Sequence, residues 1–262
     1  MVCPVLRSGR FGCDNHSALL MERTKSYFVA DVHLGLGIGN PQEREDRFVQ
    51  FLKSIRNPET KALYLLGDIW DFWFEYRDVI PREGARVVSE LIQLLDEGVD
   101  VFFFEGNHDM WAFSFFESLG MKRLQQPYFT EIGGKTFCLG HGDGLGGAKW
   151  NYALMLKVFH SKVAQRLFST LHPWLAYRFG LGWSNSNRRT HKPYEFKGES
   201  EPLYKFAASS ERKADFYIFG HYHCSADATL PDGSRLFIVK DWMSGGAPHI
   251  CFDSETSQPL SH

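Results

Sequence analysis

The sequence has no long apolar run and no hydrophobic leader. No stretch of its 262 residues approaches the roughly 20 apolar residues that a membrane-spanning helix needs. The first 20 residues contain Arg7 and Arg10 but no apolar core, which argues against a secretory signal. We therefore predict no bilayer-spanning segment. We expect residues 1–24 to be a disordered leader or a stretch upstream of the true start, for which Met21 is available.

Cysteine is scarce and shows no pairing pattern. The cysteines are odd in number and include no C-x-x-C pair: Cys3, Cys13, Cys138, Cys224 and Cys251. This usage argues against a disulfide framework and for reduced thiols, which predicts a cytoplasmic protein. Cys224 stands beside one of the motifs described below. We interpret it as a packing residue, because the other candidate ligands offer oxygen and imidazole nitrogen instead of sulfur.

Acidic residues are absent from one long segment, 144–194. Its basic residues are Lys149, Lys157, Lys162, Arg166, Arg178, Arg188, Arg189 and Lys192. Because the whole chain has 29 basic and 31 acidic residues, the rest of the chain keeps 21 basic residues against 31 acidic ones. The body therefore lacks the broad basic track that binding to a phosphate backbone requires, and we predict no nucleic-acid partner.

What the sequence does contain is a series of five short motifs rich in histidine and carboxylate. They are Asp31-Val32-His33, Gly67-Asp68-Ile69-Trp70-Asp71, Gly106-Asn107-His108-Asp109, Gly140-His141-Gly142-Asp143 and Gly220-His221-Tyr222-His223. Each follows an apolar run that predicts a buried strand, at 27–30, 62–66, 101–104, 136–139 and 216–219. Ligand-type side chains at the carboxyl ends of successive strands meet at one rim of a sheet, where open α/β proteins build their sites.

One such motif alone is more often an accident of a polar loop than a ligand pair. Five in a row are different. A buried structural histidine needs no preceding glycine, no acid in register and no strand ending beside it. The series therefore predicts a dinuclear metal enzyme.

Helical segments alternate with the strands in the first half of the chain. Residues 43–55 and 84–97 carry apolar side chains at helical spacing, which gives the β-α-β-α order of an α/β fold. Gly133-Gly134 predicts a hairpin, and Pro231-Asp232-Gly233 predicts a turn within a β-rich C-terminal part.

In their order and in their amino-acid sequences, the five motifs resemble those of the calcineurin-like metallophosphoesterase superfamily. The stretches LGDIWDFWFEY at 66–76 and GHGDGLG at 140–146 are further similar to its UDP-2,3-diacylglucosamine pyrophosphatase (hydrolase) branch, which acts in lipid A biosynthesis. The resemblance runs from about residue 25 to 253 and leaves 254–262 as a tail. It implies an α/β fold, a four-layer α-β-β-α sandwich, with a helical lid inserted at about 145–194.

The resemblance also implies two divalent metal ions. Family precedent favours Mn²⁺, and Fe²⁺ or Zn²⁺ suit the same nitrogen and oxygen ligands. The implied ligands fall into three groups: Asp31, His33 and His223 at one metal, Asn107, His141 and His221 at the other, and Asp68 as the bridge. A carboxylate can share its two oxygens between cations about 4 Å apart, and the neutral ligands leave a positive charge that admits a phosphate.

Two residues are implied in catalysis. His108 would donate to a phosphate oxygen or to the leaving group, and Asp71 would accept from its ring and hold its tautomer. The expected substrate contacts are Asn107, His108, Ser184, Arg188 and Arg189. Part of the branch carries Arg at the position of His108, so the resemblance leaves the exact substrate open.

The acid-free segment is also strongly apolar, with residues such as Trp150, Phe159, Trp174 and Trp183 between its basic residues. One interpretation is an ordinary helical subdomain whose solvated face is basic. The other, which we favour, is a lid that takes an acyl chain and attracts anionic head groups at a membrane surface.

The function that follows is hydrolysis of the pyrophosphate bond of UDP-2,3-diacylglucosamine, giving UMP and 2,3-diacylglucosamine 1-phosphate. The enzyme would be cytoplasmic and peripheral to the inner membrane. The alternative is a soluble phosphodiesterase or nucleotide-sugar pyrophosphatase without an acyl requirement. A metal-binding scaffold without turnover is disfavoured, because a scaffold has no need of an open dinuclear site. The sequence does not fix the oligomeric state.

Overall fold

The computed structural model describes residues 22–147, 150–188 and 194–262, with 185–188 described as backbone only. Within these ranges, six strands form a first sheet in the order β11-β10-β1-β2-β3-β4. Their bounds are β1 Lys25–Val29, β2 Thr60–Leu65, β3 Asp100–Phe104, β4 Lys122–Leu124, β10 Ile250–Asp253 and β11 Gln258–Ser261. β1 to β4 run parallel, whereas β10 pairs antiparallel with both β1 and β11.

A second sheet of the described residues has the strand order β5-β6-β7-β9-β8. Its strands are β5 Tyr128–Ile132, β6 Lys135–Leu139, β7 Phe216–Phe219, β8 Ala226–Thr229 and β9 Arg235–Ile238. The hairpin predicted about Gly133-Gly134 joins β5 to β6, and the predicted turn at 231–233 joins β8 to β9. β6, β7 and β9 run parallel at the centre of this sheet.

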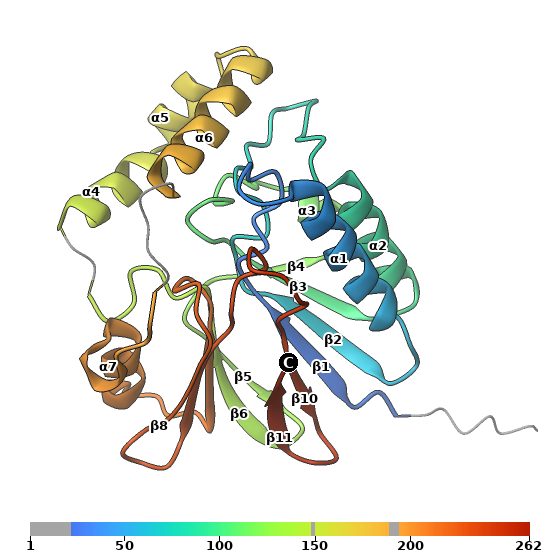
Figure 1. The fold of residues 1–262 in the computed structure, drawn as a ribbon, viewed down its shortest axis with the longest axis vertical. Helices are drawn as coiled ribbons and strands as arrows, with labels where there is room; N and C mark the ends of the chain where they lie inside the picture. The colour runs from blue at the N-terminus through green and yellow to red at the C-terminus, as the bar shows by residue number, and fades with distance from the viewer. Residues whose placement is uncertain (1–21, 148–149, 189–193) are drawn as a thin grey trace, which may run out of the picture.

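Helices cover the outer faces of the two sheets (Figure 1). On the first sheet lie α1 Pro41–Ser54 and α2 Ala85–Asp96, with the short α3 Phe115–Ser118 nearby. On the second lies α7 Pro202–Ser209, preceded by the 3₁₀ turn η1 Gly198–Ser200. α1 begins at Pro41 because the Asn40 side chain accepts from the Glu43 N–H, and it turns Phe48, Phe51 and Leu52 toward the sheet.

Three hydrophobic layers hold these elements together. One lies between α1, α2 and the first sheet and includes Phe48, Trp70 and Leu91. A second lies between the sheets, with Phe28 and Phe137 stacked at 5.8 Å, and a third joins the second sheet to α7. Each fully buried side chain of this size stabilises the fold by about 1.5–3 kcal/mol. The predicted α/β fold with four α-β-β-α layers is confirmed.

In the described part of the acid-free segment, three helices stand at one end of the sandwich: α4 Trp150–Phe159, α5 Lys162–Phe168 and α6 Pro173–Arg188 (Figure 1). Residues 148–149 and 189–193, at the two ends of this helical group, lie outside the described residues. No described helix combines the length and apolar character needed to cross a membrane.

The structure describes the expected tail, residues 254–262, but little of the expected leader, residues 1–24. Most of the expected leader, residues 1–21, lies outside the described residues. Of the segment set apart as a tail, residues 258–261 form β11, which extends the first sheet through its pairing with β10. Pro259 is tolerated there because β11 lies at the edge of the sheet.

Candidate metal centre

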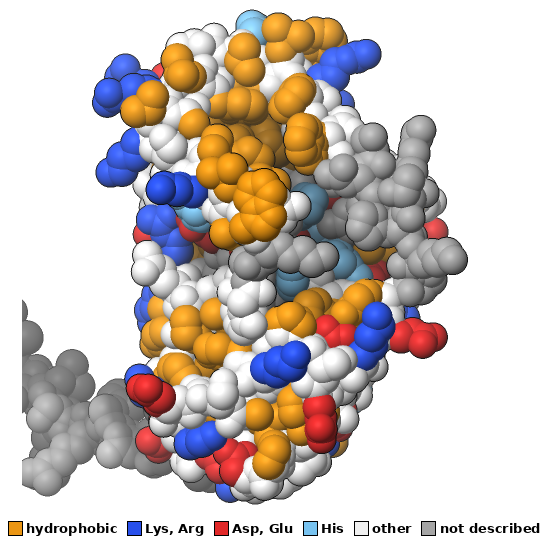
Figure 2. Space-filling view, turned by 90° about the vertical axis from the view of Figure 1, so that its left-hand side faces the viewer, with side chains coloured by type: hydrophobic (Ala, Val, Ile, Leu, Met, Phe, Trp, Pro, Cys, Tyr) orange, Lys and Arg blue, Asp and Glu red, His pale blue; other side chains and the backbone are white. Residues whose placement is uncertain are grey.

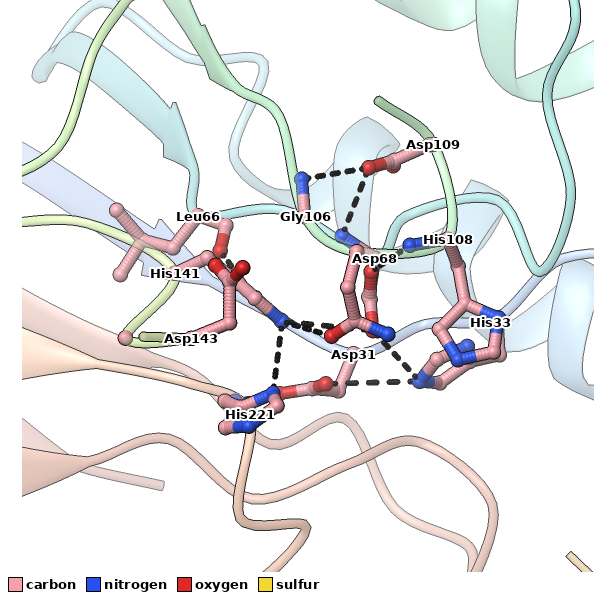
Figure 3. Close-up of polar contacts among 12 residues, drawn as sticks. Asp31, His33, Leu66, Asp68, Gly106, His108, Asp109, His141, Asp143 and His221 are labelled. Carbon is pink, nitrogen blue, oxygen red and sulfur yellow. Dashed lines mark hydrogen bonds and ion pairs between the residues drawn. The ribbon is translucent and has the colours of Figure 1, made fainter. Parts of the chain in front are cut away.

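The five motifs lie in loops that follow β1, β2, β3, β6 and β7. The sequence predicted that they would lie on one rim of a single sheet. The structure instead divides them between two sheets, three loops from the first and two from the second, and the packing of the sheets brings the loops together. Figure 3 shows their side chains pointing toward one another from both sides.

Backbone strain is concentrated at these loops. Among the described non-glycine residues, six have a positive φ, and five of them are expected ligands: Asp31, His33, Asp68, His221 and His223, with φ between 51° and 70°. An L-residue in this region costs about 1–2 kcal/mol. The surrounding structure therefore holds these side chains in directions that a relaxed loop would not give.

A glycine permits the closest approach between two of the loops. A Cβ added at Gly106 would lie 2.2 Å from Oδ1 of Asp68. Only the bare backbone fits there, because real Cβ atoms essentially never approach another heavy atom so closely. The same contact lets the His108 N–H donate to Asp68 Oδ1 at 2.9 Å.

Asp31 and two histidines form one half of the cluster. The Nε2 atoms of His33 and His223 lie 3.5 and 3.7 Å from Asp31 Oδ1, and all three residues come together as a possible cation site. His33 Nε2 is also 3.7 Å from Asp68 Oδ2, which connects this half to the expected bridging residue. Asp31 and His33 are completely buried.

His141 lies at the centre of the other half. Its Nδ1 is 3.0 Å from the carbonyl oxygen of Leu66, which can only accept, so Nδ1 carries a proton and neutral His141 offers a lone pair at Nε2. That Nε2 lies 3.2 Å from Asn107 Oδ1 and 3.3 Å from His221 Nδ1. It is also 3.4 Å from Oδ2 of Asp68.

Several electron-pair donors thus converge on one point. Ligand atoms on a single cation lie about 3 to 3.5 Å apart when each bond is about 2.0–2.2 Å long. The separations around His141 Nε2 match this spacing, and the donors are imidazole, amide and carboxylate groups. This donor set fits a divalent cation such as Mn²⁺, Fe²⁺ or Zn²⁺.

The electrostatics of the cluster favour a bound cation. Burial raises the pKa of Asp68, but His141, His108 and His33 outweigh it and hold that pKa well below its usual range. Burial, together with His141, lowers the pKa of His221 to about 4, so its ring is neutral. Burial also lowers the pKa of His141, but Asp68 raises it well above the usual value. In the metal-free protein a proton therefore competes for the position that a cation would take, and metal affinity falls as the pH falls.

Asp71 occupies a different place from the one expected. His108 is held by the backbone carbonyl of Asp71, 2.9 Å from its Nδ1, and the Asp71 carboxylate lies farther away at 3.7 Å. That carboxylate is closer to Nδ1 of His33, at 3.2 Å. A carboxylate behind a ligating histidine fixes the ring and raises its basicity, so the geometry gives Asp71 a positioning role toward His33.

Ser184 on α6 completes this arrangement. Its hydroxyl donates to Asp71 Oδ1 at 2.8 Å, and the residue is 2% exposed. Its expected contact with substrate stays a prediction, whereas its observed contact is with the positioning carboxylate. Arg189 lies outside the described residues, as does the side chain of Arg188.

Two acids were given no role from the sequence. Asp109 accepts from four backbone N–H groups, those of Asp68, Ile69, Trp70 and Gly106, at 2.8–3.3 Å. It thereby joins the loops after β2 and β3 (Figure 3). Burial raises its pKa to about 7, while the Gly106 and Trp70 amides act to lower it. Asp241 Oδ2 lies 3.8 Å from His223 Nδ1.

The only sequence signal for Asp109 was its place as the last residue of the third motif. Asp241 stands outside all five motifs.

The insertion helices pack directly on the loop that follows Asp71. Phe72 and Phe74 contact Phe168 and Tyr177, and the Tyr177 hydroxyl donates to the Phe74 carbonyl at 2.6 Å. A Cβ on Gly180 of α6 would come within 2.4 Å of the Phe72 ring. The helices are therefore seated against the candidate metal centre.

Comparison with known proteins identifies the family of this chain. Residues 24–225 match the family model described as calcineurin-like phosphoesterase. The chain is 35% identical to a UDP-2,3-diacylglucosamine hydrolase of Porphyromonas gingivalis over 240 residues, covering 84% of this chain and 91% of that protein. It is 31% identical to one of Neisseria gonorrhoeae, with 88% and 95% covered.

Among solved structures, a dimetal phosphatase from Danio rerio superposes with a TM-score of 0.43 at 12% identity, covering 92% of this chain and 98% of that one. By the family match and its similarity to these relatives, the chain belongs to the calcineurin-like phosphoesterase family and is a hydrolase.

Proposed function

We propose that this protein hydrolyses the pyrophosphate bond of UDP-2,3-diacylglucosamine, giving UMP and 2,3-diacylglucosamine 1-phosphate in lipid A biosynthesis. The relatives bearing that name cover most of the chain. The observation that carries the proposal is an exposed apolar surface on α6, a helix that also packs on the loops of the candidate metal centre. A phosphoesterase acting on small soluble substrates has no need of such a surface.

In this proposal two divalent ions, most simply Mn²⁺, are held by the seven expected ligands. When bound, such ions polarise a phosphate and provide hydroxide at neutral pH. Asp31, His33 and His223 would hold one ion, Asn107, His141 and His221 would hold the other, and Asp68 would be shared between them. No side-chain nucleophile is then required.

His108 is the residue best placed to assist the reaction. Its Nδ1 lies 2.9 Å from the carbonyl oxygen of Asp71, a contact that holds the ring at the edge of the cluster. The side chain is 21% exposed, in contrast to the buried His33 beside it. In this proposal, His108 donates to a phosphate oxygen or to the departing sugar phosphate.

The insertion supplies the lipid half of the proposal. Leu175, Phe179 and Trp183 share one face of α6 with Arg178 and line a groove of about 460 Å³. The spacing i, i+4, i+8 makes this a continuous stripe, which we call the α6 stripe. Hydrophobic side chains gather over this end of the molecule, with histidines directly beneath (Figure 2). In the proposal, the stripe contacts acyl chains and, with nearby basic residues, the surface of an anionic inner membrane.

The test is a direct assay of products. Purified protein loaded with Mn²⁺ is incubated with UDP-2,3-diacylglucosamine in heavy-oxygen water, with UDP-glucose as the matched substrate that lacks acyl chains. We expect UMP carrying the label, 2,3-diacylglucosamine 1-phosphate without it, and at least about 100-fold slower turnover of UDP-glucose, since each buried methylene contributes about 0.8 kcal/mol.

Equal turnover of the two substrates would instead favour the soluble nucleotide-sugar pyrophosphatase. Label in the sugar phosphate would overturn attack at the α-phosphorus.

A further inference from the structure

A second hollow opens beside the candidate metal centre and is not lined by the helices α4–α6. It has a volume of about 610 Å³, within the range of about 300–1,000 Å³ that is typical of small-molecule pockets. Its lining includes Tyr194, Glu195, Phe196, His223 and Lys240. His223 is thus shared between this pocket and the metal cluster, because its Nε2 lies 3.7 Å from Asp31 Oδ1.

One wall of the pocket is aromatic and rigidly held. Tyr194 is 40% exposed, while its hydroxyl donates to the Glu201 carboxylate at 2.7 Å. Tyr222 packs against the same ring, with 5.3 Å between the centroids. Phe196, two residues along, is half-buried. An aromatic ring that is fixed at one end and open on its surface is a suitable platform for a nucleobase.

The pocket also presents charges that are not used elsewhere. Glu195 and Lys240 are both exposed, and neither makes a hydrogen bond or ion pair with any other residue that the structure describes. A carboxylate accepts hydrogen bonds from ribose hydroxyls or from the N–H of a uracil ring. An ammonium group in the same pocket as His223 attracts a phosphate.

The substrate geometry connects these features. The scissile bond lies between two phosphates, so one side of the metal centre must receive the diacylated sugar and another must receive the nucleoside. The α6 stripe provides the apolar side and contains no lining residue in common with the second pocket.

We propose that the Tyr194–Lys240 pocket binds the nucleoside end of the substrate and retains it as the departing UMP. This assignment rests on the proposed function for the identity of the base. It assigns stacking to Tyr194, recognition of a hydroxyl or ring N–H to Glu195, and phosphate attraction to Lys240.

The test measures binding, not turnover. Calorimetry on the Mn²⁺-loaded protein compares UMP with methyl phosphate, which has the same charged group without the nucleoside. We expect UMP to bind at least about 10-fold more tightly. Tyr194→Ala should reduce this preference by about 5- to 100-fold, the usual contribution of stacking on a base, and leave methyl phosphate binding unchanged.

Tyr194→Phe keeps the ring and removes only the hydroxyl that bonds Glu201, so it should keep the preference. It thereby separates loss of stacking from loss of folding. Lys240→Ala should weaken UMP binding by about 2- to 10-fold, whereas Lys205→Ala on α7, an exposed lysine outside the pocket, should have no effect.

Equal affinities of UMP and methyl phosphate in the unmodified protein would overturn the proposal, as would an unchanged preference in Tyr194→Ala. These results are independent of the product assay. A protein that prefers UMP yet leaves the diacylated substrate intact retains a nucleoside pocket and serves another nucleotide. If the protein cleaves the lipid substrate but does not prefer UMP, only the proposal for the Tyr194–Lys240 pocket is overturned.

Discussion

The loops of the candidate metal centre and the helices of the insertion are built in opposite ways. In the loops, polar side chains such as Asp31, His33 and His141 are completely buried, and the backbone of Asp31 and His33 is strained. In the helices, apolar side chains are turned outward, and Trp150 is 80% exposed. A buried polar cluster needs a ligand to satisfy its charges, and an exposed apolar surface needs a partner to cover it. We therefore expect the loops to determine the reaction chemistry and the helices to determine the choice of a lipid substrate, and the following substitutions test that separation.

The largest effect should follow Asp68→Asn. Asp68 is the expected shared ligand, and an amide cannot offer two charged oxygens, so both metal positions should weaken together. We expect well under two equivalents of metal by mass spectrometry and a loss of activity on the order of 10⁴-fold. Two tightly bound ions and a near-normal rate would show that Asp68 is not a bridge.

His108→Ala should be nearly as damaging to the rate but not to the metals. We expect two ions to remain and the turnover of every substrate to fall by about 10²- to 10⁴-fold. His108 also lies near His33 and Asp68 in a possible cation site. Loss of metal in this variant would make His108 a ligand and not a proton donor.

Asp109→Asn should act through the loops. An amide has one acceptor oxygen, whereas the carboxylate accepts four N–H groups through two. We expect destabilisation by about 1–3 kcal/mol in thermal unfolding and a roughly 10- to 100-fold loss of activity, as is usual for groups that position ligands. An unchanged melting temperature would contradict this role.

On the other side of the comparison, Phe179→Ser combined with Trp183→Ser should affect only the lipid substrate. We expect activity on UDP-2,3-diacylglucosamine to fall by about 10- to 100-fold, because the variant cannot bury acyl surface. Hydrolysis of a small chromogenic phosphodiester and metal content should be unchanged. Leu260→Ser, an equally exposed apolar residue on β11, is the matched control. An equal loss of activity on both substrates would contradict a role of these side chains that is limited to the lipid substrate.

The smallest effect concerns the membrane. Arg178 is exposed on α6 above the ring of Trp174, and one basic residue near an anionic surface contributes about 1 kcal/mol. Arg178→Gln should therefore reduce sedimentation with phosphatidylglycerol vesicles by about fivefold at low salt, without changing turnover of the chromogenic diester. Binding that is insensitive to salt and to this change would exclude an electrostatic contribution.

The sequence was informative where the signal was local. The strands before the motifs were predictable as short apolar runs, and in three motifs a glycine directly precedes the histidine or acid. The pairing of those strands was not predictable from such patterns. β1, for example, lies between β2 and β10, and β10 is more than 200 residues away. The division of the motifs between two sheets depends on those long-range pairings.

The roles of the acids depend on directions that spacing does not specify. The sequence pattern predicted that the Asp71 carboxylate pairs with His108. In the structure the backbone carbonyl of Asp71 contacts His108, and the carboxylate lies closer to His33. Ser184 of α6, more than 100 residues after Asp71 in the sequence, donates a hydrogen bond to the Asp71 carboxylate. β11 was missed because its sequence, QPLS, has neither β-branched residues nor alternation.

The positive φ angles of Asp31, His33, Asp68, His221 and His223 also bear on how this protein can be engineered. At these positions a glycine would relieve the backbone and remove a ligand in the same step. Substitution of His221 by glycine should therefore give a protein with one weakened metal position that is more stable than one carrying alanine there, and equally inactive. Thermostability selected without selecting for turnover would draw substitutions to the residues that we expect to bind metal. In this fold, a search for robust variants needs activity as a constraint from the first round, because stability and function compete at the same five residues.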